Sequence, residues 1–386
     1  MSENGFSGFC RADGRVGVRN HLLVLSTVAL TNRLAEMVAE SVPGSLLLTA
    51  EFMRGLRGRD VLIQNRVIDG MIRHPNVGAV LAIVHDAAAG ERMRETLAHA
   101  GKPSDVLVFM NAHGMADAVA EGRGALMRLA AAIAGAARET VPWSRLAVAL
   151  ECGGSDATSA LFANPVIGRF VDWLTDRGGT AIVSETAEFI GAEPVVRSRA
   201  ATPAVAAQIL DRISRIEEMM KADGEDYRGV NPTAENLAAG LTTLVEKSMG
   251  AVAKTGKAQF VACLDFAETP QQAGLCFMDT PFFSPVSITG MVCGGAQLVL
   301  FGVGVFNPSG NPLAPTIKVC GNPATMQTWA DSLDLDVSGI LSADRNIDEM
   351  ATALRETVAR VAGGAQSCAE SWREGQIIAP KSVAAL

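Results

Sequence analysis

Runs of apolar, β-branched residues alternate along most of the chain with segments whose apolar positions recur at helical spacing. Within the runs the apolar character is continuous, which is typical of strands that are buried on both faces of a sheet. This alternation predicts an α/β fold with largely parallel sheets and helical crossovers. The expected strands lie at 22–28, 77–84, 105–109, 146–150, 180–184, 260–264 and 298–302.

Two of the expected helices have recognisable starts. Thr202 supplies a cap in front of Pro203, and an apolar stripe follows through 205–220. Ser342 is the expected cap of a helix whose apolar stripe covers 347–361. We interpret both stripes as core-facing surfaces without a separate function.

The composition changes around 137–145, where an alanine-rich helix ends. We therefore predict an N-terminal α/β domain at 1–140 and a C-terminal, Rossmann-like α/β domain at 141–386. The two lobes are expected to form a shared cleft from the loops that follow their strands. The polar, turn-rich stretch 222–233 is a candidate surface loop or lid.

Charge and composition exclude several classes of protein. A net charge of −8 and a pI near 5.3 argue against a nucleic-acid partner, which needs a basic footprint. No apolar run is long enough to span a bilayer, and residues 1–9 lack the features of a signal peptide, so no membrane partner is expected. The seven cysteines are scattered without a CxxC pair, which favours reduced thiols and a cytoplasmic protein.

The first candidate for chemistry is the stretch 13–20, DGRVGVRN. Arg15 and Arg19 carry guanidinium groups that can clamp a carboxylate, and Asn20 adds an amide donor. The alternative is a glycine-rich turn whose arginines pair with surface acids.

The second candidate is the stretch 151–156, ECGGSD, which directly follows an expected strand. Gly153 and Gly154 can expose consecutive N–H groups to an anion, and Cys152 is either a soft metal ligand or a structural thiol. Ser155 is a candidate for substrate binding and Asp156 for catalysis, although both suit helix capping equally well.

The third group of candidates lies beyond later strands. Glu185 can bind a divalent cation or act as a general base, or it can be a first-turn acid of a helix. Lys254 can neutralise an enolate or act as a base, although most lysines are solvated surface residues. The remaining substrate-binding candidates are Asp279, Thr280, Asn311 and Lys318. A GxSxG elbow, a dinucleotide-binding fingerprint and a Walker loop are absent from the sequence.

In order along the chain, several of these stretches resemble the altronate/galactarate dehydratase family, which includes the large subunit of sulfolactate sulfo-lyase. The segments that carry the resemblance span most of the chain. They are DGRVGVRN (13–20), HPNVGAV (74–80), ECGGSDATSALFANP (151–165), GGTAIVSETAEFIGAE (178–193), NPTAENLAAGLTTLVEKSMGAVAKTG (231–256), GLCFMDTP (274–281) and GNPLAPTIKVCGNP (310–323).

The resemblance implies a lyase that eliminates water from a 2-hydroxy or polyhydroxy sugar acid through an enediolate, giving a 2-keto-3-deoxy acid. It also implies a divalent metal, Fe²⁺ or Mn²⁺, and a small SAF-type domain that many members carry in front of this region or on a separate subunit. We further expect a homo-oligomer that acts on a small anionic hydroxy acid.

Three stretches depart from the family pattern: the family's Thr-Gly-Arg-Gly loop reads GVGVF (302–306) here, and the other two lose a cysteine. The family has a His-xx-Gly-Cys-Gly segment where this chain reads TAEFMRGLRG (49–58), and Gly-Cys-Glu where it reads Val84-His85-Asp86. His85 therefore joins Cys152 and Glu185 as an expected metal ligand, and this ligand set would suit Fe²⁺ or Zn²⁺. The departures keep two alternatives open, a sulfo-lyase type of elimination and a substrate-binding or partner subunit with reduced catalysis.

Overall fold

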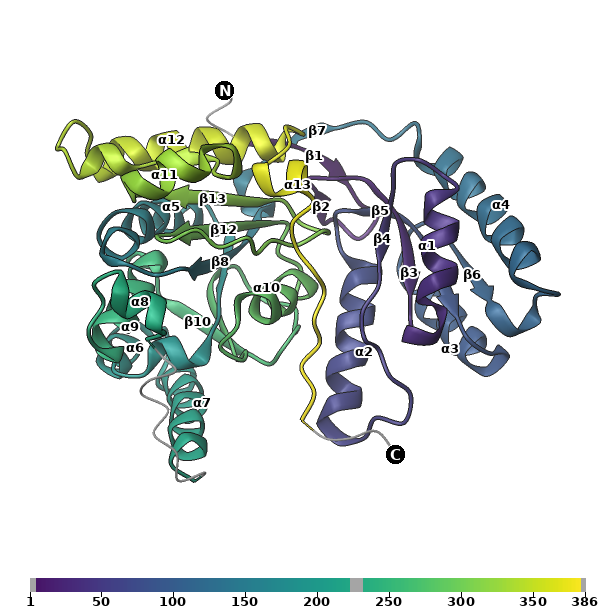
Figure 1. The fold of residues 1–386 in the computed structure, drawn as a ribbon, viewed down its shortest axis with the longest axis horizontal. Helices are drawn as coiled ribbons and strands as arrows, with labels where there is room; N and C mark the ends of the chain where they lie inside the picture. The colour runs from purple at the N-terminus through teal and green to yellow at the C-terminus, as the bar shows by residue number, and fades with distance from the viewer. Residues whose placement is uncertain (1–4, 223–231, 383–386) are drawn as a thin grey trace.

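A computed structural model describes residues 5–222 and 232–382 of the 386-residue chain, so the predicted loop at 222–233 lies almost entirely outside the described residues. The described chain forms two α/β lobes that lie side by side (Figure 1). Their sheets are parallel throughout, as the continuous apolar runs predict. No helix among the described residues combines the length and the apolar character that crossing a membrane requires.

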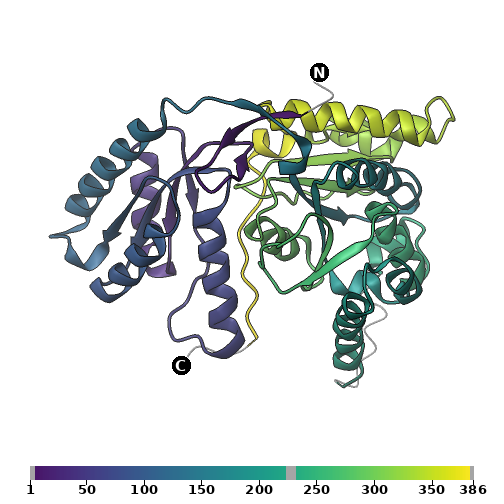
Figure 2. The ribbon, with the colours of Figure 1, turned by 180° about the vertical axis from the view of Figure 1, so that it is seen from behind.

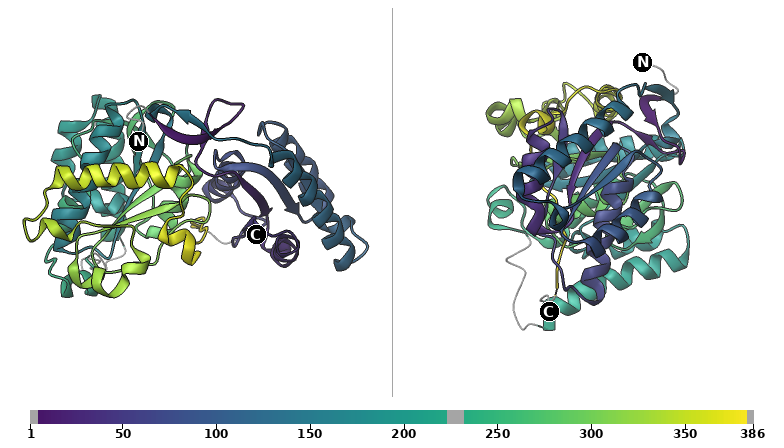
Figure 3. Two further views of the ribbon diagram at one scale, coloured as in Figure 1. Left: turned by 90° about the horizontal axis from the view of Figure 1, so that it is seen from above. Right: turned by 90° about the vertical axis from the view of Figure 1, so that its right-hand side faces the viewer.

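The N-terminal lobe is built on a four-stranded sheet with helices on both faces (Figure 3, right). The strand order is β4 (Ser45–Leu48), β3 (His21–Ser26), β5 (Val77–Val84) and β6 (Ser104–Val108). One face packs against α1 (Asn32–Glu40) and α4 (Met115–Ile133), and the other against α2 (Gly58–Arg73) and α3 (Ala87–Ala98). All eight residues of β5 are buried, which agrees with a central strand covered on both faces.

The C-terminal lobe is built on a seven-stranded sheet. Its order is β10 (Phe260–Leu264), β11 (Gly274–Met278), β9 (Thr180–Val183), β8 (Ala147–Gly153), β12 (Leu298–Val303), β13 (Thr316–Cys320) and β14 (Leu335–Asp336). Successive residues of β8 alternate between its faces: Val148 and Leu150 enter one apolar cluster, and Ala149 enters the other. The helices of this lobe are α5 (Asn164–Thr175), α6 (Glu193–Arg199), α7 (Pro203–Ala222), α8 (Ala234–Ala238), α9 (Leu244–Val252), α10 (Ser284–Cys293), α11 (Pro323–Trp329), α12 (Ile347–Ala362) and α13 (Cys368–Trp372).

Two connections outside the large sheets join the lobes. Strands β2 (Val16–Gly17), β1 (Phe6–Cys10) and β7 (Glu139–Val141) form a small antiparallel sheet, and the boundary predicted at 140 falls within β7. Residues 373–382 then return along the junction between the lobes (Figures 1 and 2). This C-terminal strap ends where the backbone N–H and the hydroxyl of Ser382 donate to the carboxylate of Asp60 on α2.

The lobes also share an apolar core, because α2 packs against α10 within one continuous cluster of buried residues. The contact is close at Gly70, where an added Cβ atom would lie 2.4 Å from the carbonyl oxygen of Cys293. A side chain at this position would therefore force the two helices apart.

The seven expected strands are present with ends shifted by up to three residues, and Thr202 caps α7 by accepting from the N–H of Val205. The cap expected at Ser342 is wrong. Asn346 caps α12 instead, in a reciprocal capping box with Glu349, whereas the Ser342 hydroxyl donates to Gly339 and Asp344.

Replacement of Gly70 by alanine should lower the free energy of unfolding by about 1–3 kcal/mol, because the new methyl group overpacks the contact between α2 and α10. Gly124, inside α4 with no backbone atom near its missing Cβ, is the matched control, and Gly124→Ala should stabilise by about 0.5–1 kcal/mol. Urea unfolding of both variants measures the difference. Equal effects of the two substitutions would contradict the close interlobe contact.

Candidate active site

Charged side chains gather inside the C-terminal lobe, where β8 and β9 end next to each other. Glu151 and Cys152 lie near the end of β8. Glu185 and Glu188 follow β9, Glu185 in the loop and Glu188 in the short helix η5 (Thr186–Phe189). Lys247 on α9 and Lys254 on the short helix η7 (Ala253–Thr255) complete the group. We call this set the buried cluster: Glu151, Cys152, Glu185, Glu188, Lys247 and Lys254, whose exposed fractions lie between 0 and 5 %.

Lys254 is the centre of the buried cluster. Its ammonium group donates to Glu188 Oε2 at 2.9 Å and to Cys152 Sγ at 3.1 Å. The thiol of Cys152 contacts the same carboxylate at 3.6 Å, and Lys247 Nζ lies 3.8 Å from Glu188 Oε1. Glu188 therefore has two cations, and this pairing offsets much of the cost of burying its charge.

Glu151 and Glu185 form a second pair of buried acids, each of which affects the pKa of the other. Ser287 on α10 donates its hydroxyl to Glu151 Oε2, and Ser284 donates to Oε1 at 3.4 Å. Burial raises the pKa of Glu151 to about 7, with Lys254 opposing the shift. Burial also raises the pKa of Glu185 well above its ordinary value, and the negative charge of Glu151 raises it further.

The buried cluster combines a strongly held positive charge on Lys254 with acidic groups whose pKa values are raised. Although burial alone would lower the pKa of Lys254, the surrounding acidic groups raise it well above its ordinary value, so this lysine stays charged. Burial raises the pKa of the Cys152 thiol to about 11, so the thiol keeps its proton near neutral pH. A carboxyl pair in which one pKa is raised to about 7 and the other well above its ordinary value can both accept and donate a proton.

The backbone at Glu185 is strained, because this residue has a φ of 64°, in the left-handed region that side chains other than glycine avoid. Two contacts hold it there. The N–H of Glu185 donates to the hydroxyl of Thr280, and the next residue, Thr186, donates its hydroxyl to Asp279. The chain turns at this left-handed residue soon after β9 ends, and the Glu185 side chain is buried.

A cavity of about 550 Å³ lies between the lobes beside the buried cluster. Its wall includes Asp279 and Thr280, which contact the Glu185 segment, and Phe282, whose ring centroid lies 4.1 Å from Lys247 Nζ. On the opposite side the wall is formed by α2 and the C-terminal strap: Arg59, Asp60, Ile63, Pro380, Lys381 and Ser382. A cavity between the lobes therefore exists, but its N-terminal side is formed by α2 and the C-terminal strap and not, as predicted, by loops that follow strands. The buried cluster lies behind its C-terminal wall.

The anion clamp predicted at Arg15, Arg19 and Asn20 is wrong for Arg19. All five N–H groups of its guanidinium are used in structural bonds, to Glu370 Oε1 and Oε2 and to the carbonyls of Val18, Val361 and Ala365. Arg15 pairs with Asp13 and donates to the carbonyl of Arg73, and Asn20 bonds Arg11 and the carbonyl of Ile133. This stretch fastens the lobes together, as the alternative of paired arginines allowed.

In the stretch 153–156 the structure favours the capping alternative. Asp156 accepts from the N–H of Ser159 and from Asn322, so its carboxylate is used within the fold. Ser155 is buried, and its carbonyl accepts from Asn236. Gly153 and Gly154 pack against the loop 305–307, which leaves no room for a Cβ atom at either position.

The other predicted substrate-binding residues are divided between two places. Asp279 and Thr280 line the interlobe cavity. Lys318 instead forms a buried ion pair with Glu374 of the C-terminal strap, and the side chain of Asn311 accepts from the N–H of Leu313. Neither Lys318 nor Asn311 lines the interlobe cavity.

The predicted metal site does not assemble. Cys152 and Glu185 lie in the buried cluster, whereas His85 lies in the N-terminal lobe beside Arg54 and Asp86. Across 5–222 and 232–382, no three side chains of the kinds His, Cys, Asp and Glu are placed to hold one metal ion. Cys152, Glu185 and His85 therefore do not fit the divalent ion that the family resemblance implies.

Sequence reasoning brought Cys152, Glu185 and Lys254 to one site but assigned no role to Glu151, Glu188 or Lys247. A positional signal for the second lysine was present, since Lys247 and Lys254 are seven residues apart and share a helix face. Glu151 and Glu188 stand one and three residues from side chains that were chosen, but only the fold shows that they point inward.

The comparisons with known proteins agree across the two lobes. The pattern of the second domain of D-galactarate dehydratase/altronate hydrolase matches residues 8–134, and that of the D-galactarate/altronate dehydratase C-terminal domain matches 143–384. The (2R)-sulfolactate sulfo-lyase subunit beta of Chromohalobacter salexigens is 34% identical over 95% of this chain and 94% of its own. The altronate dehydratases of Bacillus subtilis and Escherichia coli are 31% and 30% identical, over 88% and 93% of this chain and 70% and 74% of their own.

The stability of the protein should depend on pH through Glu151. Because its pKa rises from 4.5 to about 7 on folding, the folded state holds a proton that the unfolded state releases, and stability is lost as the pH rises from 4.5 to 7. The loss is about 3 kcal/mol. Glu151→Gln should reduce this pH dependence in urea unfolding, and Glu95→Gln, at an exposed position of α3, should not. An unchanged pH slope in Glu151→Gln would contradict the assignment.

Removal of the central cation should be strongly destabilising. Lys254→Met leaves the Glu188 carboxylate buried without its closest partner, which should cost about 3–5 kcal/mol in urea unfolding. The double variant Lys254→Met/Glu188→Gln should recover part of that loss. Lys257→Met, at an exposed position three residues away, should change the stability by less than about 0.5 kcal/mol. A double variant no more stable than Lys254→Met would show that Glu188 is not the dependent partner.

Proposed function

The chain belongs to the D-galactarate/altronate dehydratase family and is an enzyme of the lyase class, and from its site we propose that it eliminates water from a hydroxylated carboxylic acid. The substrate class is a 2-hydroxy or polyhydroxy sugar acid, and the product is a 2-keto-3-deoxy acid. The observation that carries the proposal is the buried pair of Glu151 and Glu185 beside the charged Lys254, behind the wall of the interlobe cavity.

The carboxyl pair supplies both proton transfers of the elimination. Glu151, with a pKa near 7, is the base that removes the proton from the carbon next to the substrate carboxylate. Glu185, whose pKa burial raises well above its ordinary value, is the acid that donates a proton to the departing β-hydroxyl, which leaves as water. The carbon–oxygen bond breaks, the enol tautomerises to the keto acid, and the proton balance of the pair is restored through solvent.

Lys254 supplies the charge that such a reaction needs. Proton removal next to a carboxylate places negative charge on an enediolate, and a fixed cation in a water-excluded site stabilises it more than water does. Lys254 is fully buried and stays charged, and Lys247 lies behind Phe282 at the cavity wall. Because the cluster is buried, we propose that the Thr280–Phe282 segment moves aside when the substrate enters.

Elimination of sulfite is the second candidate reaction. The relative named sulfolactate sulfo-lyase subunit beta covers this chain nearly end to end, whereas the two altronate dehydratases extend well beyond the matched region. Sulfite leaves without an added proton, so the same base and cation would suffice. That relative is named as a subunit, which supports an assembly of more than one subunit. We propose that the partner is a small SAF-type subunit and that the oligomeric assembly acts in the cytoplasm.

Purified protein should convert at least one acid in a panel of hydroxy and sugar acids to a 2-keto-3-deoxy acid, detected as the keto acid. The panel is run with and without a small partner subunit and with and without added Fe²⁺ or Mn²⁺. Glu185→Gln should lower kcat for dehydration by roughly 100-fold to 10,000-fold, because the hydroxyl loses its acid. Release of sulfite would instead be little affected by this substitution.

The matched control is Glu193→Gln, in the same sequence segment but outside the buried cluster. It should leave the rate unchanged. Binding of an acid without any product, in all arms of the panel, would favour a binding subunit with reduced catalysis and would count against the lyase proposal. Sulfite released without keto-deoxy acid would favour the second reaction.

A further inference from the structure

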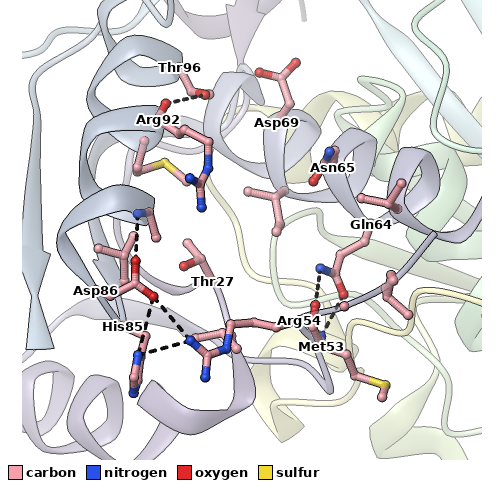
Figure 4. A pocket seen from close by; sticks show the side chains of 18 residues that line it. Thr27, Met53, Arg54, Gln64, Asn65, Asp69, His85, Asp86, Arg92 and Thr96 are labelled. Carbon is pink, nitrogen blue, oxygen red and sulfur yellow. Dashed lines mark hydrogen bonds and ion pairs between the residues drawn. The ribbon is translucent and has the colours of Figure 1, made fainter. Parts of the chain in front are cut away.

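A second cavity, of about 570 Å³, lies wholly within the N-terminal lobe and takes no part in the proposed reaction (Figure 4). It opens where β3 and β5 end, between α2 and α3. The chain runs outward from β3 to β4 on one side and then crosses back to β5 on the other. This reversal is the switch point at which parallel α/β sheets commonly bind ligands, beyond the carboxyl ends of the strands.

The polar groups of this cavity favour an anion. Arg92 on α3 points its guanidinium into the space, and among the residues that the structure describes this group makes no hydrogen bond or ion pair (Figure 4). Arg54 enters from the loop before α2 and contacts His85 and Asp86 at 3.4 and 3.2 Å. Of the two acids in the wall, Asp86 is paired with Arg54 and Asp69 with Arg73, so Arg92 is the cation left without a counter-charge.

Arg54 and His85 come from the two stretches that lose a family cysteine, 49–58 and 84–86. The cavity therefore carries the nitrogen donors of an arginine and a histidine where the resemblance implies cysteines. Arginine recognises carboxylates and phosphates through paired N–H groups and has no lone pair to offer a metal. This exchange of side chains replaces thiols, which are soft metal ligands, with donors that suit an anion.

The remaining wall distinguishes between anions. Leu56, Ile68 and Met93 give the cavity apolar surface, and its volume lies in the range of sites for small organic ligands. The start of α3 is already capped by the Asp86 carboxylate, which accepts from the N–H of Ala89 and would repel a phosphate dianion at that position. We propose that this cavity binds a small organic carboxylate, with Arg92 and Arg54 holding the carboxylate and the apolar wall covering its carbon body.

This site is separate from the interlobe cavity, although one helix contributes to both. Arg59, Asp60 and Ile63 of α2 face the interlobe cavity, and Gln64, Asn65 and Ile68, on another side of the same helix, line the second cavity. Each cavity is lined by two methionines, whose methyl resonances can reveal a ligand bound there. Met53 and Met93 line the second cavity, and Met219 and Met220 line the interlobe cavity.

The test uses protein labelled with ¹³C at the methionine methyl groups, titrated with malonate, glycolate and inorganic phosphate. At least one carboxylate should shift the Met53 and Met93 resonances with a Kd of roughly 1 mM or below. Arg92→Ala should weaken this binding roughly tenfold or more, because a charge-assisted hydrogen-bond pair is lost. Arg94→Ala is the matched control on α3, since Arg94 pairs with Glu91 and does not line the cavity, and it should bind as the unaltered protein does.

Three outcomes would overturn the proposal. The first is the absence of any shift at Met53 and Met93 with both carboxylates, and the second is a shift confined to Met219 and Met220. The third is phosphate binding as tight as the tighter carboxylate, which would point to a generic anion site. Circular dichroism of Arg92→Ala separates a lost ligand from a lost fold, and the proposed elimination reaction can fail or succeed independently of this result.

Discussion

The ion pair between Lys254 and Glu188 allows this protein to bury several acids in one place. Three glutamates and a thiol inside a lobe would be prohibitively costly to ionise together, because each charge leaves water without compensation. Lys254 contacts one glutamate directly, and its charge lowers the pKa of another, Glu151, which otherwise would stay protonated to a much higher pH. The pKa of Glu151, near 7, therefore depends on a lysine that belongs to a different element of the fold.

This dependence explains how the elements are arranged around the site. The acids come from the ends of the adjacent parallel strands β8 and β9, where the chain must turn and side chains can converge. The lysines come from α9 and η7, which lie far along the sequence and are brought in by the packing of η7 against α5. The left-handed backbone at Glu185 costs conformational free energy, and the contacts with Thr280 and Asp279 hold the chain in this conformation.

The sequence predicted the strands well because a buried parallel strand leaves a strong local signal, as β5 does with eight successive apolar or small residues. The short strand β4 and the edge strand β14 were not predicted, and neither were β11 and β13. Cys152, Glu185 and Lys254 were chosen because they follow strands or lie in an unusual stretch. Arg19 was misjudged because a guanidinium suits an anion and backbone carbonyls equally well, and only the tertiary structure decides which it meets.

The C-terminal strap has a consequence for how the protein is made. Residues 373–382 leave the ribosome after both lobes, yet they supply Lys381 and Ser382 to the wall of the interlobe cavity and bond α2 of the first lobe. Each lobe can collapse around its own sheet during synthesis, because its strands are contiguous in the sequence. The cleft between them acquires its full wall only afterwards, so a chain stalled or cut shortly before residue 373 would hold two folded lobes and an unfinished cleft.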